Sequence, residues 1–143
     1  MHLISHRPSP AGEPVDHHDL ALRTIVRAAC LPPRDETIVL FLDDAQCAVV
    51  VVTVTGTARP DAVIDVVECL TAPAAHGGRV SSVIVGTVRT RRTAADEAER
   101  DVDRWLEISD IAEGHGVEVL EWYVIDPDGP SCPRDRLGEP PRW

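Results

Sequence analysis

The sequence predicts a single α/β domain in which a mixed β-sheet is flanked by helices. Its length of 143 residues suits one domain with a hydrophobic core of its own. Hydrophobic residues make up 43% of the chain but aromatic residues only 3%, so the core must consist mainly of aliphatic side chains. Runs of β-branched residues alternate with segments of helical periodicity, which gives the order α-β-β-α-β-α-β.

A helix and a hairpin are expected in the first half of the chain. Residues 1–15 are rich in proline and poor in apolar side chains, which predicts a flexible N-terminal arm. A first helix is expected over residues 17–30, with Asp16 as its cap. Two apolar runs, over residues 37–42 and 47–55, are joined by a short polar turn, a pattern typical of an antiparallel hairpin.

Helices and strands alternate in the second half. Pro60 fits the first position of a second helix, whose apolar residues recur at helical spacing until Pro73 and two glycines end the segment. A third strand is expected over residues 82–88, and a long helix over residues 93–113. The last strand is expected over residues 117–125.

The C-terminal residues 138–143 form a Pro-rich tail that ends in Trp143. Extended Pro-rich backbone with a terminal aromatic residue can dock in a groove of a partner protein. Alternatively, the tail folds back so that Trp143 covers a sheet edge or the core. The folded domain is therefore expected over residues 16–137.

Composition excludes several classes of function. The net charge of −10 argues against a general affinity for DNA or for anionic lipid. No apolar run approaches the ~20 residues that cross a bilayer, and the N-terminus lacks the apolar core of a secretory signal, so a cytoplasmic protein is expected. The four cysteines include no Cys-x-x-Cys pair and are expected to be free thiols. All 14 basic residues are arginine, which indicates a high-GC bacterial genome.

Several landmarks occur in the same order as in the JAB/MPN domain of the RadC family, which this chain resembles over about residues 20–137. The matching positions are residues 39–43 (VLFLD), 55–57 (TGT), 59–61 (RPD), 120–122 (LEW) and Ser131. The resemblance implies the layering of that fold, which is similar to that of cytidine deaminases. It also implies a link to DNA metabolism.

The zinc-binding motif of the resembled family is incomplete here. In that family a His-x-His-Pro motif followed by Ser-x-x-Asp holds zinc, which acidifies a bound water. The corresponding strand, residues 83–89, has no histidine, and Trp122 stands where the family often has another. Thr93 and Asp96 match Ser-x-x-Asp as a remnant of the motif, although the same pair can cap a helix. By neighbourhood, Glu36 or Asp61 could supply the family's general base.

Histidines near the N-terminus suggest a separate metal hypothesis. His2, His6, His17 and His18 could gather around a divalent ion, but histidines in such a segment are more often solvated. We therefore expect neither a metal nor another cofactor.

A short run of arginines is the strongest local anomaly. In this acidic chain, residues 79–92 contain four arginines and no acid. Arg89, Arg91 and Arg92 come between the end of a strand and the start of a helix, where the active site of the resembled family lies. Helix N-termini favour anions, and guanidinium groups suit phosphate or carboxylate. The alternative is that these arginines pair with acids of the next helix, namely Glu97, Glu99 or Asp101.

The sequence thus favours a catalytically inactive, RadC-like JAB/MPN domain that acts as a protein-interaction or anion-binding module. Its expected contacts are Arg89, Arg91, Arg92 and Trp143. The expected partner is another protein, a small anion or a nucleotide, and a homodimer is compatible with the pattern. Two alternatives remain: an enzyme of altered mechanism in the same pocket, and a nucleotide or nucleic-acid binder linked to DNA metabolism.

Overall fold

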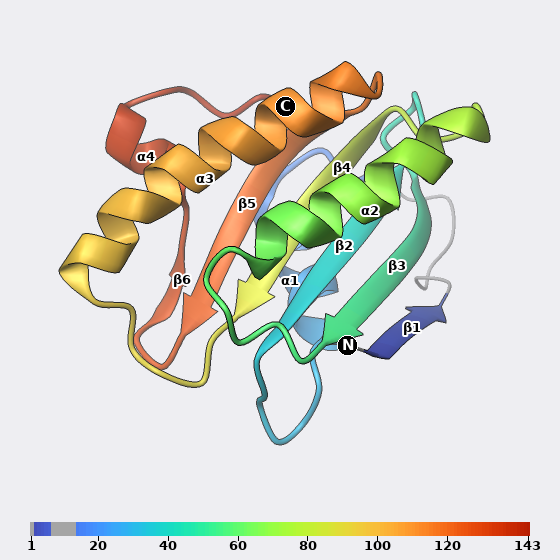
Figure 1. The fold of residues 1–143 in the computed structure, drawn as a ribbon. Coiled ribbons are helices and arrows are strands. Elements are labelled where there is room, and N and C mark those ends of the chain that lie inside the picture. The colour runs from blue at the N-terminus through green and yellow to red at the C-terminus, as the bar shows by residue number, and fades with distance from the viewer. Residues whose placement is uncertain (1, 7–13) are drawn as a thin grey trace.

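The computed structural model describes residues 2–6 and 14–143, which form one α/β domain (Figure 1). Its strands are β1 (His2–His6), β2 (Glu36–Leu42), β3 (Ala48–Thr55), β4 (Ser82–Val88), β5 (Glu118–Asp126) and β6 (Gly129–Ser131). Its helices are α1 (His18–Ala28), α2 (Ala62–His76), α3 (Ala95–Gly114) and α4 (Pro133–Leu137). Each strand predicted from the sequence is present within one residue of its expected ends. β1, β6 and α4 are additional elements.

The described strands form one sheet in the order β1-β3-β2-β4-β5-β6. The β2–β3 hairpin is antiparallel, as its short polar turn predicts, and β4 also runs antiparallel to β2. β5 is parallel to β4 because α3 carries the chain back along the sheet between them. The sheet is therefore mixed, as the sequence predicts.

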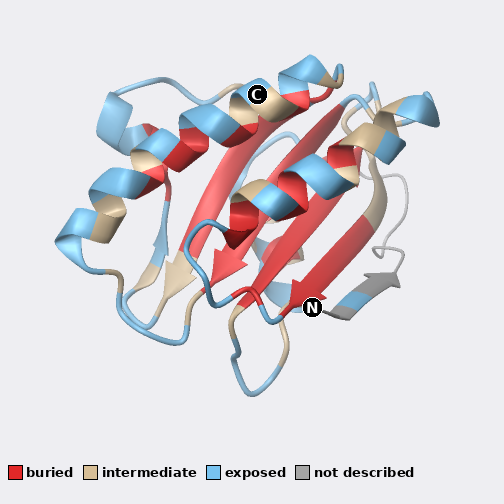
Figure 2. Ribbon diagram, in the orientation of Figure 1, coloured by how far each residue is buried: buried red, intermediate tan, exposed pale blue. Residues whose placement is uncertain are grey.

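Helices cover both faces of the sheet. α2 and α3 lie side by side over one face, and α1 lies on the opposite face (Figure 1). In β4, Val83 and Val85 belong to the core cluster that includes α2 and α3, whereas Ile84 belongs to the cluster on the α1 face. β2 and β4 are buried along their whole length (Figure 2). Burial on both faces explains why these strands are continuous apolar runs.

Gly86 allows α1 to pack closely against β4. A Cβ atom on this glycine would lie 2.3 Å from Cγ2 of Ile25, whose side chain has no exposed surface. That separation is far shorter than a van der Waals contact, so a larger residue at this position would have to displace α1.

The N-terminal segment differs from the flexible arm expected over residues 1–15. Residues 2–6 form β1, which pairs antiparallel with the outer edge of β3. Pro14 makes an isolated bridge with Cys47, and Val15 is buried. Unpaired N–H and C=O groups along an edge strand favour such pairing, which composition alone does not reveal. Residues 7–13 of the expected arm lie outside the described residues.

Two helix ends also differ from expectation. The Asp16 carboxylate bonds to Nδ1 of its neighbour His17 at 2.9 Å and does not cap α1. α2 begins at Ala62, with Asp61 as its N-cap, and not at Pro60; Pro73 lies inside the helix, which ends at His76 before the two expected glycines. None of the described helices is both long and apolar enough to cross a membrane.

The C-terminal tail folds back onto the domain, one of the two arrangements expected for it. The Arg142 guanidinium lies 4.4 Å from the centroid of the buried Trp105 ring and donates a hydrogen bond to the Val119 carbonyl at 2.8 Å. Trp143 is half-buried and packs against the core cluster on the α1 face. The tail therefore contributes to packing within its own domain.

Candidate functional site

A cavity of about 640 Å³ opens at the N-terminal end of α3. We call it the α3 cleft, and its walls are the loop of residues 89–94, the first turn of α3, and parts of the loops that precede β2 and α2. Five predicted site residues line it: Arg89, Arg91, Arg92, Thr93 and Asp96. The structure thus places in one cavity all of the predicted site residues except Trp143.

Arg89 is an internal ion-pair partner. Its NH1 and NH2 groups each donate a hydrogen bond of 2.8 Å to a different oxygen of Asp101. The side chains of Arg89 and Asp101 are only 14% and 3% exposed. Two parallel charge-assisted hydrogen bonds in a buried setting make a strong and geometrically specific contact. Arg89 therefore fixes the end of β4 to α3, through one of the acids that the sequence offers as alternative partners.

Asp101 also belongs to a larger network centred on Arg104. The Arg104 guanidinium donates to Asp101 at 2.9 Å, to Asp61 at 2.8 Å, and to Glu97. Burial works against a charged Arg104, but these hydrogen bonds outweigh it and raise its pKa. The same contact lowers the pKa of the Asp61 carboxyl. The network joins the start of α2, the first half of α3 and the end of β4.

Sequence reasoning overlooked Asp101 and Arg104 as a structural pair. A signal was present, because both lie in phase with the buried residues Trp105 and Ile108 of α3 rather than on its exposed face. Charged residues that share a core-facing helix position need a partner. Arg104 also pairs with Asp61, which lies 43 residues away in the chain, and the local pattern does not predict that contact.

Three further contacts fix the loop of residues 89–94. The Arg89 N–H bonds to the Ile125 carbonyl at 2.8 Å, and the Thr90 N–H bonds to the Asp35 carboxylate at 3.0 Å. The Thr93 N–H bonds to Asp126 at 2.9 Å. Partial burial tends to raise the pKa of Asp126, but the hydrogen bonds that its carboxylate accepts outweigh burial and lower it. The loop is thus held from β5 and from the segment before β2.

The prediction that Thr93 and Asp96 form a capping pair is wrong. The N-cap of α3 is Ala94, which makes no side-chain cap hydrogen bond. Thr93 Oγ1 instead accepts a hydrogen bond from Arg89 at 3.1 Å, while Asp126 takes the Thr93 N–H. Because the first N–H groups of a helix have no intrahelical acceptor, those of Ala95, Asp96 and Glu97 remain free at the edge of the cleft.

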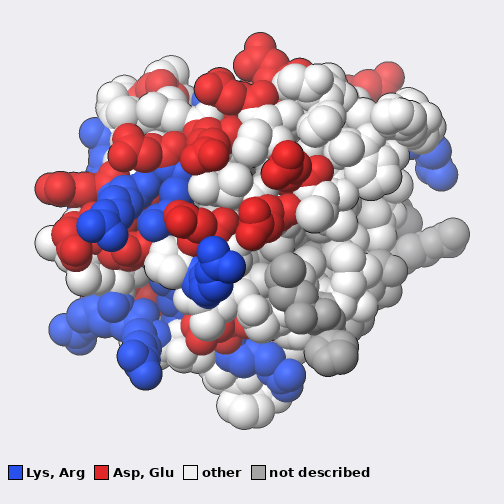
Figure 3. Space-filling view, in the orientation of Figure 1, with Lys and Arg blue, Asp and Glu red and all other residues white. Residues whose placement is uncertain are grey.

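The remaining arginines of the loop are exposed. Arg92 Nε lies 3.0 Å from Asp128, with both side chains more than half exposed, and such surface pairs contribute at most about 1 kcal/mol. Within the part of the chain that the structure describes, Arg91 makes no ion pair. Basic side chains gather in the region of this loop, below the acidic surface of α3 (Figure 3). Arg91 is therefore the loop cation that is available to a ligand.

The residues of the cleft do not fit the zinc implied by the resemblance to RadC proteins. Among residues 2–6 and 14–143, no group of three or more His, Cys, Asp or Glu side chains could hold a metal ion. Asp96 lines the cleft beside arginines, which repel a cation. Trp122, at a position where the resembled family often has a histidine, donates its indole N–H to the Thr87 hydroxyl on β4 at 2.9 Å.

The two carboxylates considered as a general base do not line the cleft. Asp61 pairs with Arg104, and Glu36 is fully buried on the α1 face, where it accepts the Cys30 N–H at 2.7 Å. The N-terminal histidines give no support to a metal site: His18 contacts the Tyr123 hydroxyl at 3.0 Å. The side chains of His2 and His6 lie outside the described part of the structure.

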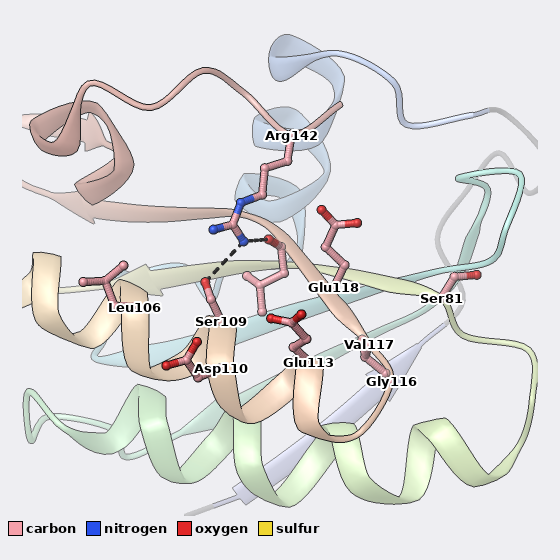
Figure 4. A pocket seen from close by; sticks show the side chains of 10 residues that line it. Ser81, Leu106, Ser109, Asp110, Glu113, Gly116, Val117, Glu118 and Arg142 are labelled. Carbon is pink, nitrogen blue, oxygen red and sulfur yellow. Dashed lines mark hydrogen bonds between the residues drawn. The ribbon is translucent and has the colours of Figure 1, made fainter.

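A second cavity, of about 570 Å³, lies at the opposite end of α3 (Figure 4). Its acidic residues are Asp110, Glu113 and Glu118. Figure 4 shows the Arg142 side chain reaching into this cavity from the tail, where it donates hydrogen bonds to Ser109 and to the Val119 carbonyl. We call it the acidic cavity, and its cation comes from the chain itself.

The chemistry that the α3 cleft offers is anion binding: an exposed guanidinium and free N–H groups of a helix N-terminus face one cavity. The Thr90 hydroxyl donates to the Asp35 carboxylate at 3.2 Å, and this contact helps to fix the loop. Comparison with known proteins does not assign the chain to a family, because no family model matches it and no curated protein matches it significantly.

Proposed function

We propose that this chain is a RadC-like JAB/MPN domain without hydrolytic activity, which binds the phosphate or carboxylate group of a ligand in the α3 cleft. The observation that carries the proposal is that the residues of the loop 89–94 differ in whether their donors are already engaged. Arg89, Thr90 and Thr93 use their donors to fix the loop, while the Arg91 guanidinium has no hydrogen-bond partner within residues 2–6 and 14–143. A loop held in this way loses little entropy when an anion binds.

Electrostatics at the end of α3 support this function. A helix N-terminus carries a partial positive charge of roughly half an elementary charge, and its free N–H groups point outward. The guanidinium of Arg91 adds a full charge and can donate two parallel hydrogen bonds to one anionic group. Arg92 can join when an anion competes with its exposed partner Asp128. Asp96 opposes binding, since its carboxylate lines the same cleft.

The fold is compatible with JAB/MPN layering because a mixed sheet lies between helices on both faces. The ion-pair network of Arg89, Asp101 and Arg104 occupies the region next to Thr93 and Asp96, the remnant of the metal motif. In this proposal the network replaces a metal as the element that organises the site. The domain then serves as a receptor for an anionic group.

The test is a calorimetric titration of the full chain with inorganic phosphate at low ionic strength, where surface electrostatics are least screened. Arg91→Gln should weaken phosphate binding about tenfold, which corresponds to the loss of a charge-assisted contact. Arg79→Gln is the matched control: it removes the same charge from an exposed residue before β4, at the other end of that strand. It should leave the affinity unchanged. Equal affinities for wild type and Arg91→Gln, or an absence of binding, would overturn the proposal.

A further inference from the structure

A third cavity adjoins the α3 cleft, and its lining is mostly apolar. It has a volume of about 420 Å³ and lies between the end of α1, the loop after α1, and the ends of β4 and β5. We call it the apolar pocket; its apolar lining includes Val26, Ala29, Leu31, Val88, Ile125 and Pro127. Arg89 and Thr90 line both cavities, so these two residues form a shared wall.

The polar groups of the pocket wall are already engaged. Arg89 is paired with Asp101, Thr90 bonds to Asp35, and the Asp126 carboxylate accepts the N–H groups of Thr93 and Asp128. Cys30 also lines the pocket, and a hydrogen bond with Glu36, aided by desolvation, raises the pKa of its thiol, which keeps the thiol neutral. The surface that faces into the pocket therefore offers apolar contact.

The rim of the apolar pocket exposes large side chains to water. Val26 is 51% exposed, and Leu31 is 88% exposed. Apolar side chains that are exposed together around a concave pocket are typical of a ligand-binding site. The volume is sufficient for an aromatic ring or a short acyl chain, since a cavity of about 150 Å³ already accommodates benzene.

We infer that the ligand of this protein is an organic anion in which a phosphate or carboxylate is joined to a compact apolar group. The anionic end contacts Arg91 and the start of α3, and the apolar end crosses the Arg89–Thr90 wall into the apolar pocket. The inference rests on the proposed anion site and adds the class of molecule that carries the anion. A second copy of the chain is disfavoured because each copy has a net charge of −10, whereas a small anion can contact Arg91 in the adjoining cleft.

The experiment compares two probes, inorganic phosphate and phenyl phosphate, by calorimetry on the full chain. Phenyl phosphate should bind about tenfold tighter or more, because burial of a ring adds to the same anionic contact. The double variant Val26→Gln/Leu31→Gln should reduce the affinity for phenyl phosphate to that for phosphate and leave phosphate binding unchanged. Arg91→Gln should weaken both probes. Leu106→Gln is the control: it removes another exposed leucine, which lies on α3 at the acidic cavity.

The outcomes separate the inference from the proposed function. Equal affinities of wild type for the two probes would overturn the inference and leave the anion site intact. Binding of phenyl phosphate that depends on Val26 and Leu31 but not on Arg91 would overturn the anion site, and with it this inference. A dimer in sedimentation experiments that is lost in the double variant, without a difference between the probes, would assign the apolar pocket to self-association instead.

Discussion

The cavities at the two ends of α3 differ in how their arginines are engaged. At its C-terminal end, Asp110, Glu113 and Glu118 line the acidic cavity, and Arg142 of the tail reaches into it (Figure 4). At its N-terminal end, Arg91 lines the α3 cleft without an ion pair among the described residues. In the α3 cleft the guanidinium of Arg91 and the positive end of the helix dipole both favour an anion.

This difference indicates which end offers a cation to a ligand. In the acidic cavity, Arg142 is engaged with Ser109 and the Val119 carbonyl. At the N-terminal end, Asp101 and Glu97 pair with arginines and Asp126 holds the loop. Of the acids that line the α3 cleft, only Asp96 opposes an anion without a hydrogen bond or ion pair of its own among the described residues. The unpaired charge of Arg91 results from the arrangement of these side chains and not from the composition, since the chain has ten more acids than basic residues.

The largest expected effect comes from breaking the network at the N-terminal end. Asp101→Asn leaves the buried guanidiniums of Arg89 and Arg104 without their shared carboxylate, which should cost about 3–5 kcal/mol of unfolding free energy. Chemical denaturation measures this loss. Asp103→Asn, an exposed change two residues along the same helix, should stay within about 0.5 kcal/mol of wild type. A loss below about 1 kcal/mol in Asp101→Asn would contradict a structural role for the network.

Removal of the arginine at the other end of α3 should have a smaller effect. Arg142→Ala loses the stacking on Trp105 and the hydrogen bond to Val119, which together are expected to contribute about 1–2 kcal/mol. Thermal or chemical unfolding measures the change, and Arg136→Ala, an exposed substitution on α4, serves as the control. Phosphate affinity should not change in either variant. A weaker affinity in Arg142→Ala would show that the two ends of α3 are not independent.

Acid should release the loop at the N-terminal end. The folded-state pKa of Asp126 lies below its usual value of 3.8, so its contribution to stability is fully present above pH 3.8 and is lost as the pH falls through the folded-state value. The difference in unfolding free energy between wild type and Asp126→Asn should therefore shrink below about pH 4. A difference that is constant between pH 6 and pH 3 would contradict this role of Asp126. Glu121 has the opposite sign, because burial raises its pKa in the folded state despite its contact with Arg134.

The smallest expected effect on stability accompanies a gain in binding. Asp96→Asn removes a carboxylate from the first turn of α3, which should cost about 0.3–1 kcal/mol through the helix dipole. The same change removes a repelling charge from the α3 cleft, so phosphate should bind severalfold tighter. Calorimetry and chemical denaturation on one sample give both values. Weaker phosphate binding in this variant would argue against an anion in the cleft.

The fold was largely predictable from the sequence, because continuous apolar runs and short polar turns specify buried strands and a hairpin. β1 and β6 were not predictable in the same way. Their residues lack an apolar pattern, and they form strands because the edges of β3 and β5 offer unpaired backbone groups. The same limit applies to Gly86, whose role depends on the close approach of Ile25 of α1.

The predicted site residues of the arginine run lie in one cavity, but their individual contacts were not predictable. A run of arginines before a helix does not distinguish Arg89 from Arg91. Only the position of Asp101 on the second turn of α3 makes Arg89 a structural residue. Similarly, Thr93 matches a capping pattern locally, but a carboxylate 33 residues away takes its N–H.

The most direct measurement is a titration with inorganic phosphate followed by the backbone amide signals of the full chain in solution. The account predicts saturable shifts for the N–H groups of Ala95, Asp96 and Glu97 and for Arg91, which Arg91→Gln abolishes and Arg79→Gln preserves. Saturable shifts centred instead on Arg142 and the acidic cavity, or changes without saturation anywhere, would contradict an anion site at the N-terminal end of α3.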